Sequence, residues 1–335
     1  MKKTIALLLS LAMCLSLLVS CGSSNTAAAE PAAEGSAAAE PAAAAEGSAA
    51  AEGSAADWKS QLTTITAGKL TVATSPDFSP YEFYALDENK NPTLAGFDVA
   101  LAKYIADYLG LELEMVTVDF DGVLSELAAK HVDLGLAGLS PDPKRENAMD
   151  FSDIYYEGGQ SLVTVKANAE SIKSFEDINS PDFTIGAQTG SIQLDLANQN
   201  TPNANIVSMP KVTDIISELL AGKEYAAFIE TDVAKSYQKN YPDLEIVLDV
   251  PYDQQGSAIG VCKGNAALLA GVNEAIAAAK ADGSLETYIA EANELASGEK
   301  YEGLLDENGA APAAEASAEA SATAETSAEA SASAQ

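Results

Sequence analysis

Short apolar runs rich in β-branched residues alternate with helix-periodic segments between residues 69 and 297, and this alternation most constrains the fold. Residues 70–74, LTVAT, are typical of a strand, whereas Phe97, Leu101, Ile105 and Leu109 recur every four residues, as on one face of a helix. Such alternation is the signature of α/β layering. About 240 residues exceed one small α/β unit, so we predict two lobes.

The pattern predicts the individual elements as follows. Strands are expected at 70–74, 112–117, 132–138, 160–165, 183–187, 204–208, 225–229, 243–247 and 257–262. Helices are expected at 97–109, 120–129, 143–148, 191–199, 211–221, 230–240, 265–282 and 284–297. The helix at 143–148 rests on Asp142 as N-cap and Pro143 at the first helical position. Ligands of open α/β sheets bind outside the carboxyl ends of strands, so the loops beginning at Gly138 and Glu230 should face a cleft.

The two ends of the chain differ from this body. Lys2 and Lys3 precede an apolar run too short to span a bilayer comfortably, which indicates an export signal. Its end, Leu-Val-Ser-Cys at 18–21, resembles the lipobox of bacterial lipoproteins and implies a lipid on Cys21. The alternative is an ordinary secreted protein with a chance cysteine. Alanine, serine and glutamate dominate both remaining flanks, which lack the apolar residues for a core and are expected to be disordered.

These features divide the chain into five parts. We expect a signal peptide at 1–21, a tether at 22–56, a first lobe from 57–164 plus 255–300, a second lobe at 165–254 and an acidic tail at 301–335. The protein should therefore stand on the outer face of the cell membrane as a lipid-anchored monomer.

Charge and cysteine content exclude several classes. The chain carries 50 acidic against 18 basic side chains, a net charge of −32, so nucleic acid is excluded as a partner because phosphate binding needs a basic face. Cys262 would be the lone cysteine of the body and should be a buried apolar residue. The single histidine, His131, should be exposed at a turn. We therefore expect neither a metal site nor a cofactor.

One basic pair stands out in this acidic chain. Lys144 and Arg145 lie in the stretch GLSPDPKRE at 138–146, where a Pro-bracketed turn should open a helix. Cations at a helix N-terminus oppose the macrodipole by up to roughly 1 kcal/mol. Either the pair is an indifferent surface feature, or an anion binds in front of it.

Residues 96–102, GFDVALA, resemble the GFDxxLA signature of the solute-binding proteins of bacterial amino-acid ABC importers, the polar amino-acid class called family 3. Other landmarks follow in order between residues 67 and 297: LTVATS at 70–75, PYEF at 80–83, VDLGLAGLSPDPKR at 132–145 and DFSDIYY at 150–156. The resemblance implies a type II periplasmic-binding-protein-like fold of two α/β lobes. Two hinge strands, near 162–166 and 250–256, would let the lobes close on a ligand and present it to an ABC permease.

The resemblance also implies roles for the charged residues. Arg145 matches the arginine that holds the α-carboxylate of an amino acid, for which its planar fork is suited. Ser140 adds a donor, whereas Lys144 has no implied role. Glu230 matches the acid that takes the α-ammonium, with the Gly138 carbonyl as second acceptor. Glu230 could instead simply cap its helix.

Further residues would complete the site. Ser191, Ile192 and Gln193 match the loop whose backbone N–H groups finish the carboxylate site, and Phe78 and Phe120 match the positions that sandwich the ligand side chain.

Two departures from the family pattern bear on the ligand. Asp142 stands where threonine is usual, which is tolerable only if it caps the helix. Ser75 stands where binders of cationic amino acids often have aspartate, and an unpaired ammonium in a closed cleft would be costly. We therefore expect a neutral side chain, polar or aromatic.

Two other functions remain open on these grounds. A prephenate or arogenate dehydratase is known on this fold, but it needs a general acid at the ring hydroxyl, and Glu230 is the only candidate. A ligand-sensing surface lipoprotein is the other alternative. We expect a binding protein rather than an enzyme.

Overall fold

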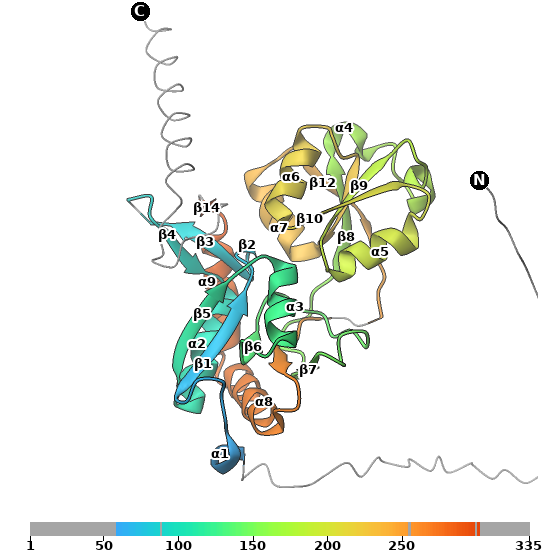
Figure 1. Ribbon diagram of the computed structural model, residues 1–335. Coiled ribbons are helices and arrows are strands. Elements are labelled where there is room, and N and C mark those ends of the chain that lie inside the picture. The colour runs from blue at the N-terminus through green and yellow to red at the C-terminus, as the bar shows by residue number, and fades with distance from the viewer. Residues whose placement is uncertain (1–57, 88, 254–255, 299, 302–335) are drawn as a thin grey trace, which may run out of the picture. The chain divides into compact units, whose positions relative to one another are not determined.

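The computed structural model describes residues 58–87, 89–253, 256–298 and 300–301 (Figure 1). The predicted signal peptide with Cys21, the tether and nearly all of the acidic tail lie outside the described residues. Within the described part, no helix combines the length and apolar character needed to cross a membrane. The predicted α/β fold of two lobes is confirmed.

A five-stranded sheet forms the centre of the first lobe, counted over the described residues. Its order is β5 (Glu112–Thr117), β1 (Lys69–Thr74), β6 (Leu134–Gly135), β13 (Gly260–Cys262) and β7 (Met149–Phe151). β1 runs parallel to β5 and β6, whereas β13 is antiparallel to β6 and β7. A smaller sheet joins β2 (Asp77–Phe78), β3 (Glu82–Leu86), β4 (Pro92–Ala95) and β14 (Lys300–Tyr301).

The helices of the first lobe come from both ends of the described chain, blue to green and orange to red in Figure 1. They are α1 (Trp58–Gln61), α2 (Phe97–Leu109), α3 (Phe120–Ala128), α8 (Ala266–Ala281) and α9 (Ser284–Leu295). α2 buries Phe97, Leu101 and Ile105, the stripe that its four-residue spacing predicts, and ends at Gly110 in a left-handed conformation. Trp58 Nε1 donates a hydrogen bond to Glu274 Oε2 (2.6 Å), which ties α1 to α8.

A second sheet forms the centre of the second lobe and is yellow-green to gold in Figure 1. It has five strands among the described residues. Its order is β10 (Asn205–Met209), β9 (Thr184–Gln188), β11 (Ala226–Glu230), β8 (Gln160–Val165) and β12 (Leu244–Asp249). Its helices are α4 (Lys166–Ala169), the 3₁₀ turn η1 (Phe175–Ile178), α5 (Ile192–Asn200), α6 (Val212–Leu220) and α7 (Thr231–Asn240).

The predicted helix at 143–148 is wrong, since these residues form successive turns. Arg145 N–H donates to Asp142 O (2.8 Å), and Ala148 N–H donates to Arg145 O (2.9 Å). Both hydrogen bonds join residues three apart, as in β-turns. β7 begins at Met149, whose partner in β13 is Cys262, so a helix has no room to extend past residue 148. Arg145 therefore has no helix N-terminus behind it.

The first crossing between the lobes is shifted from the prediction. β8 pairs on both sides with strands of the second sheet, β11 and β12, so the boundary predicted at 164 and the hinge predicted at 162–166 fall inside that lobe. The crossing is instead the segment 152–159, between β7 and β8. Tyr156 in this segment forms an isolated antiparallel bridge with Ser257, which follows β12 and the second crossing. The first crossing therefore lies beside the point where the chain returns to the first lobe.

Two single residues complete the description of the fold. Cys262 is a free, buried thiol in β13, and burial raises its pKa. His131 is exposed, and its Nδ1 lies 3.0 Å from Glu126 Oε2.

Candidate functional site

Arg145 is positioned by a turn that the Asp142 side chain stabilises. Asp142 Oδ1 accepts a hydrogen bond from Lys144 N–H (2.9 Å), and Pro143 between them fixes the backbone. The Asp142 carboxylate is therefore engaged by its own turn. The predicted role as a helix N-cap is wrong, because Asp142 caps a turn and no helix follows.

The Arg145 guanidinium joins the two lobes. Nη2 donates to Gly190 O of the second lobe (2.9 Å) and Nη1 to Ser140 O of the first (3.3 Å). The group lies over the Phe120 ring, 5.8 Å from its centroid, and desolvation lowers its pKa without removing its charge. Both hydrogen bonds go to neutral carbonyls, and none of the ion pairs between described residues includes Arg145. A partly buried cation without a carboxylate partner is suited to bind one.

Gly138 is fixed between a carboxylate and an aromatic ring. Its N–H donates to Asp98 Oδ2 (3.1 Å), which also accepts from the Tyr155 hydroxyl (2.9 Å). Its φ is +55°, and a Cβ here would lie 2.6 Å from Cε1 of Phe78. Any other residue here would need a left-handed φ and a shift of the Phe78 ring. Asp98 thus holds the backbone of the predicted ammonium acceptor, while Ser140, two residues further on, is buried.

The two predicted aromatic walls are buried but belong to separate clusters. Phe78 in β2 packs on Tyr81 with ring centroids 5.3 Å apart. Phe120, at the start of α3, packs in a different cluster and contacts Arg145. The structure therefore brings Phe78 to Gly138 and Phe120 to Arg145.

The loop before α5 faces the first lobe through Gly190. A Cβ on Gly190 would lie 3.3 Å from the Asp121 Cβ of α3. Ser191 caps α5, since its hydroxyl accepts from Leu194 N–H (3.3 Å) and donates to Gln188 O (2.7 Å).

The other two residues of this loop differ in their placement. Gln193 is buried and donates to Gln160 Oε1 (2.8 Å) within the second lobe. Ile192 is partly exposed at the start of α5.

Glu230 does cap its helix, which was the alternative to the ammonium role. Its Oε2 accepts from Val233 N–H (2.8 Å) and its Oε1 from Gly159 N–H (3.3 Å). The side chain is buried, and desolvation raises its pKa to about 7. A Cβ on Gly158 would lie 2.7 Å from Glu230 Oε1 and 2.9 Å from the Tyr81 hydroxyl oxygen. Glu230 Oε1 and the Tyr81 hydroxyl therefore both face the first crossing.

Sequence reasoning missed the contacts that join the lobes beside this site. Asp77 in β2 accepts hydrogen bonds from Gln188 Nε2 (3.1 Å) and Val212 N–H (2.5 Å) of the second lobe. Lys144, for which no role was expected, forms an exposed ion pair with Asp195 of α5 (2.7 Å). Nothing in the local pattern identifies these pairs, because the partners are 51 to 135 residues apart in sequence.

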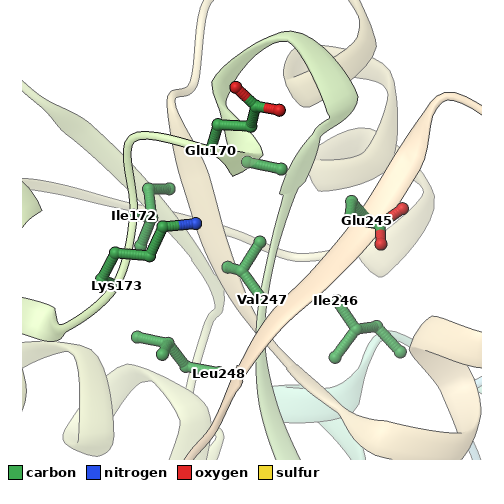
Figure 2. A pocket seen from close by; sticks show the side chains of 8 residues that line it. Glu170, Ile172, Lys173, Glu245, Ile246, Val247 and Leu248 are labelled. Atoms are coloured by element: carbon green, nitrogen blue, oxygen red, sulfur yellow. The ribbon is translucent and has the colours of Figure 1, made fainter.

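A pocket of about 340 Å³ lies elsewhere on the second lobe (Figure 2). Apolar and charged side chains from the segment 169–173 and from the edge strand β12 line it: Ala169, Glu170, Ile172, Lys173, Glu245, Ile246, Val247 and Leu248. None of the predicted ligand-binding residues lines this pocket. In the described part of the chain, no cluster of histidine, cysteine, aspartate or glutamate side chains could hold a metal ion.

Known proteins match the described body. The family model of bacterial extracellular solute-binding proteins, family 3, matches residues 70–291. The arginine-binding extracellular protein ArtP of Bacillus subtilis is 33% identical over 222 residues, which are 65% of this chain and 83% of that protein. The crystal structure of the amino acid ABC transporter substrate-binding protein AbpA from Streptococcus pneumoniae, bound to L-arginine, is 33% identical. It superposes with a TM-score of 0.66 over 69% of this chain and 97% of that one.

An enzyme is more distantly similar. The cyclohexadienyl dehydratase of Pseudomonas aeruginosa is 25% identical over 180 residues, 54% of this chain and 66% of the enzyme. The more similar relatives are binding proteins. The family match covers most of the chain and agrees with the two-lobed fold, so this protein belongs to the bacterial extracellular solute-binding proteins of family 3.

Proposed function

We propose that this protein binds one free amino acid between its lobes and delivers it to an ABC importer. The observation that carries this proposal is Arg145, a partly buried guanidinium that donates to one carbonyl from each lobe and forms no ion pair with a carboxylate of the described residues. An α-carboxylate would complete its hydrogen-bonding fork. Glu230, buried on the second lobe beside the Tyr81 hydroxyl, would take the α-ammonium while it still caps α7.

The remaining predicted residues would act around these two charges. Ser140 and the start of α5, Ser191 to Gln193, would supply further donors to the carboxylate. Phe78 and Phe120 would contact the ligand side chain. Both rings are nearly buried, with 5% and 6% exposed, so each has only a small face left for a ligand.

We propose a ligand with a neutral side chain. Ser75 offers a hydroxyl where a cationic ligand would need an acid, and this hydroxyl donates to Asp77 Oδ1 (2.6 Å). The Asp77 carboxylate is occupied by Gln188 and Val212. The similarity to proteins named for arginine makes L-arginine the alternative that an experiment must include.

We further propose that the chain is a monomeric lipoprotein. The leader at 1–21 would be removed, Cys21 would carry the lipid, and residues 22–56 would tether the body to the outer face of the membrane. The first lobe would comprise residues from 57 to the first crossing together with 255–300, and the second lobe the residues between the crossings up to 254. We assign no role to the acidic tail from 301.

A thermal-shift panel of the twenty amino acids plus L-cystine tests the ligand proposal. The full chain is unfolded in urea and refolded first, so that a co-purified ligand is removed. Ligand at 100 times its Kd stabilises the fold by about 2.7 kcal/mol. At roughly 2 to 4 °C per kcal/mol, a neutral amino acid should raise Tm by several degrees. A shift with arginine alone would overturn the neutral assignment, and a flat panel would overturn the amino-acid proposal.

Arg145 provides the matched variant for this panel. Arg145→Lys keeps the positive charge but loses the planar fork, and it should reduce affinity at least about tenfold. Lys144→Ala removes the adjacent cation, whose ion pair with Asp195 is exposed and should contribute little to binding. Isothermal titration with the panel ligand measures both. Equal losses in the two variants would show that net charge, not the fork, binds the carboxylate.

A further inference from the structure

The Asp77 carboxylate of the first lobe is buried against the second lobe. Its Oδ2 accepts from Val212 N–H (2.5 Å), at the first residue of α6, and from Gln188 Nε2 (3.1 Å), at the end of β9. Its Oδ1 accepts from the Ser75 hydroxyl (2.6 Å). The Ser75 contact within the first lobe fixes the orientation, so that Oδ2 points at the second lobe.

Other contacts surround this carboxylate at the same junction. The Tyr237 hydroxyl of α7 donates to Asp77 O (3.0 Å), and the Ser79 and Ser236 hydroxyls lie 3.0 Å apart. Val212 belongs to the same buried apolar cluster as Phe78. The lobes therefore meet here in a buried, hydrogen-bonded contact that includes the Asp77 carboxylate.

The contact also has an electrostatic basis. The first N–H groups of a helix lack partners within the helix and carry the positive end of its dipole. Lys211 is the N-cap residue of α6 and its side chain makes no capping hydrogen bond. A carboxylate from the other lobe therefore supplies the cap that the second lobe does not supply itself.

We infer that Asp77 is a positioning residue for ligand capture, which holds the start of α6 and the Gln188 amide against β2 when the lobes are together. Gln188 is two residues before Gly190, whose carbonyl accepts from Arg145. The carboxylate thus places the α5 loop opposite Arg145 and Ser140. If the lobes separate, the Val212 N–H loses this partner. The contact favours the ligand-competent arrangement before any ligand binds, and a larger competent fraction lowers the apparent Kd.

Amide hydrogen exchange on the refolded, ligand-free full chain tests this directly. In the wild type, the Val212 amide should be protected. In Asp77→Ala it should exchange at least about tenfold faster, because hydrogen bonds to charged groups are the stronger ones. Asp77→Asn keeps one carbonyl acceptor and should lie between the two. The Val233 amide, capped by Glu230 within the second lobe, should not change.

Asp133→Asn is the matched control. Asp133 is also buried and accepts two backbone hydrogen bonds, from Ile65 (2.9 Å) and Thr71 (3.0 Å), but both lie in the first lobe. This variant should lower Tm, but the ratio of the Val212 to the Val233 amide exchange rate should be the same as in the wild type. Unchanged Val212 protection in Asp77→Ala, or an equal rise at Val233, would overturn the inference.

Ligand affinity supplies the second readout, with L-glutamine and L-arginine as probes. Because the inference rests on the proposed function for its effect on binding, Asp77→Ala should raise the Kd of whichever probe binds by about tenfold. An unchanged Kd would reduce Asp77 to a structural contact. If neither probe binds the wild type, the proposed function fails for these ligands, and the exchange at Val212 still decides whether Asp77 holds α6.

Discussion

At the scale of single residues, Glu230 combines a helix cap with a proposed ligand contact, and its protonation separates the two. Burial raises its pKa to about 7 in the free protein, with Asp232 nearby acting in the same direction. A bound ammonium would favour the charged carboxylate and lower this pKa. The liganded protein would then hold fewer protons, so affinity should rise with pH from about 5 to 7 and level off above.

Titration calorimetry at several pH values measures this dependence. One pKa unit corresponds to about tenfold in affinity, so a tenfold rise between pH 5.5 and 7.5 is expected. Glu230→Gln keeps an acceptor for Val233 N–H and is the control, with weaker binding that varies less over this range because the Asp77 carboxyl, whose pKa is about 6, still titrates there. A flat profile for the wild type would leave Glu230 with the capping role alone.

The chemistry of single residues was predictable from local sequence only in part. Arg145 and Glu230 stand in stretches that match the family pattern, and their proposed roles come from that resemblance. Asp77 gave no such signal, because SPDF at 75–78, followed by a second serine, indicates an ordinary turn. Its partners Gln188 and Val212 are 111 and 135 residues away in sequence, and only the packing of the lobes brings them together.

At the scale of elements, the loop after β6 depends on Gly138. Gly138→Ala combines a left-handed φ with a Cβ 2.6 Å from the Phe78 ring, and it should lower the free energy of unfolding by about 2 to 4 kcal/mol. Gly110→Ala is the control, since its φ of +72° carries the same backbone cost of roughly 1 to 2 kcal/mol and its Cβ would meet nothing within 4 Å. Urea unfolding measures both. Equal losses would mean that Phe78 moves aside.

The longer elements were predictable because their apolar periodicity reflects burial along one face. The segments predicted at 97–109 and 112–117 match α2 and β5. The two-residue strand β2 and the three-residue strand β7 were missed, because two or three residues are too few to show the alternation of apolar and polar residues that marks a strand. The turn at 143–148 shows the opposite error, in which good capping residues predict a helix where the chain forms turns before β7 begins at Met149.

At the scale of the whole molecule, buried carboxyls link stability to pH. Burial raises the pKa of Asp77 and Asp98 to about 6, of Glu230 to about 7 and of Glu224 to about 8. An acid whose pKa is raised on folding contributes stability that is present below its ordinary pKa and is lost as the pH rises through the folded value. The protein should therefore be more stable near pH 5 than near pH 8.

Glu224 offers the clearest test of this dependence. Its side chain is buried, its oxygens accept no hydrogen bond from the described residues, and Glu218 lies nearby. Glu224→Gln removes the charge at equal size, and at pH 8 it should stabilise the fold by on the order of 3 kcal/mol. Below pH 4.5 the two proteins should be about equally stable. Calorimetric Tm values across this range measure the effect, and parallel curves would contradict it.

The pairing of Tyr156 with Ser257 has a consequence for how the two lobes can evolve. It brings the entry and exit of the second lobe together, while both ends of the described chain, α1 and β14, belong to the first lobe. The second lobe is thus a continuous insertion into the first lobe, and its two ends lie at one place. Recombination at this place would exchange Glu230 and the α5 loop together in one event. The first lobe would be unchanged.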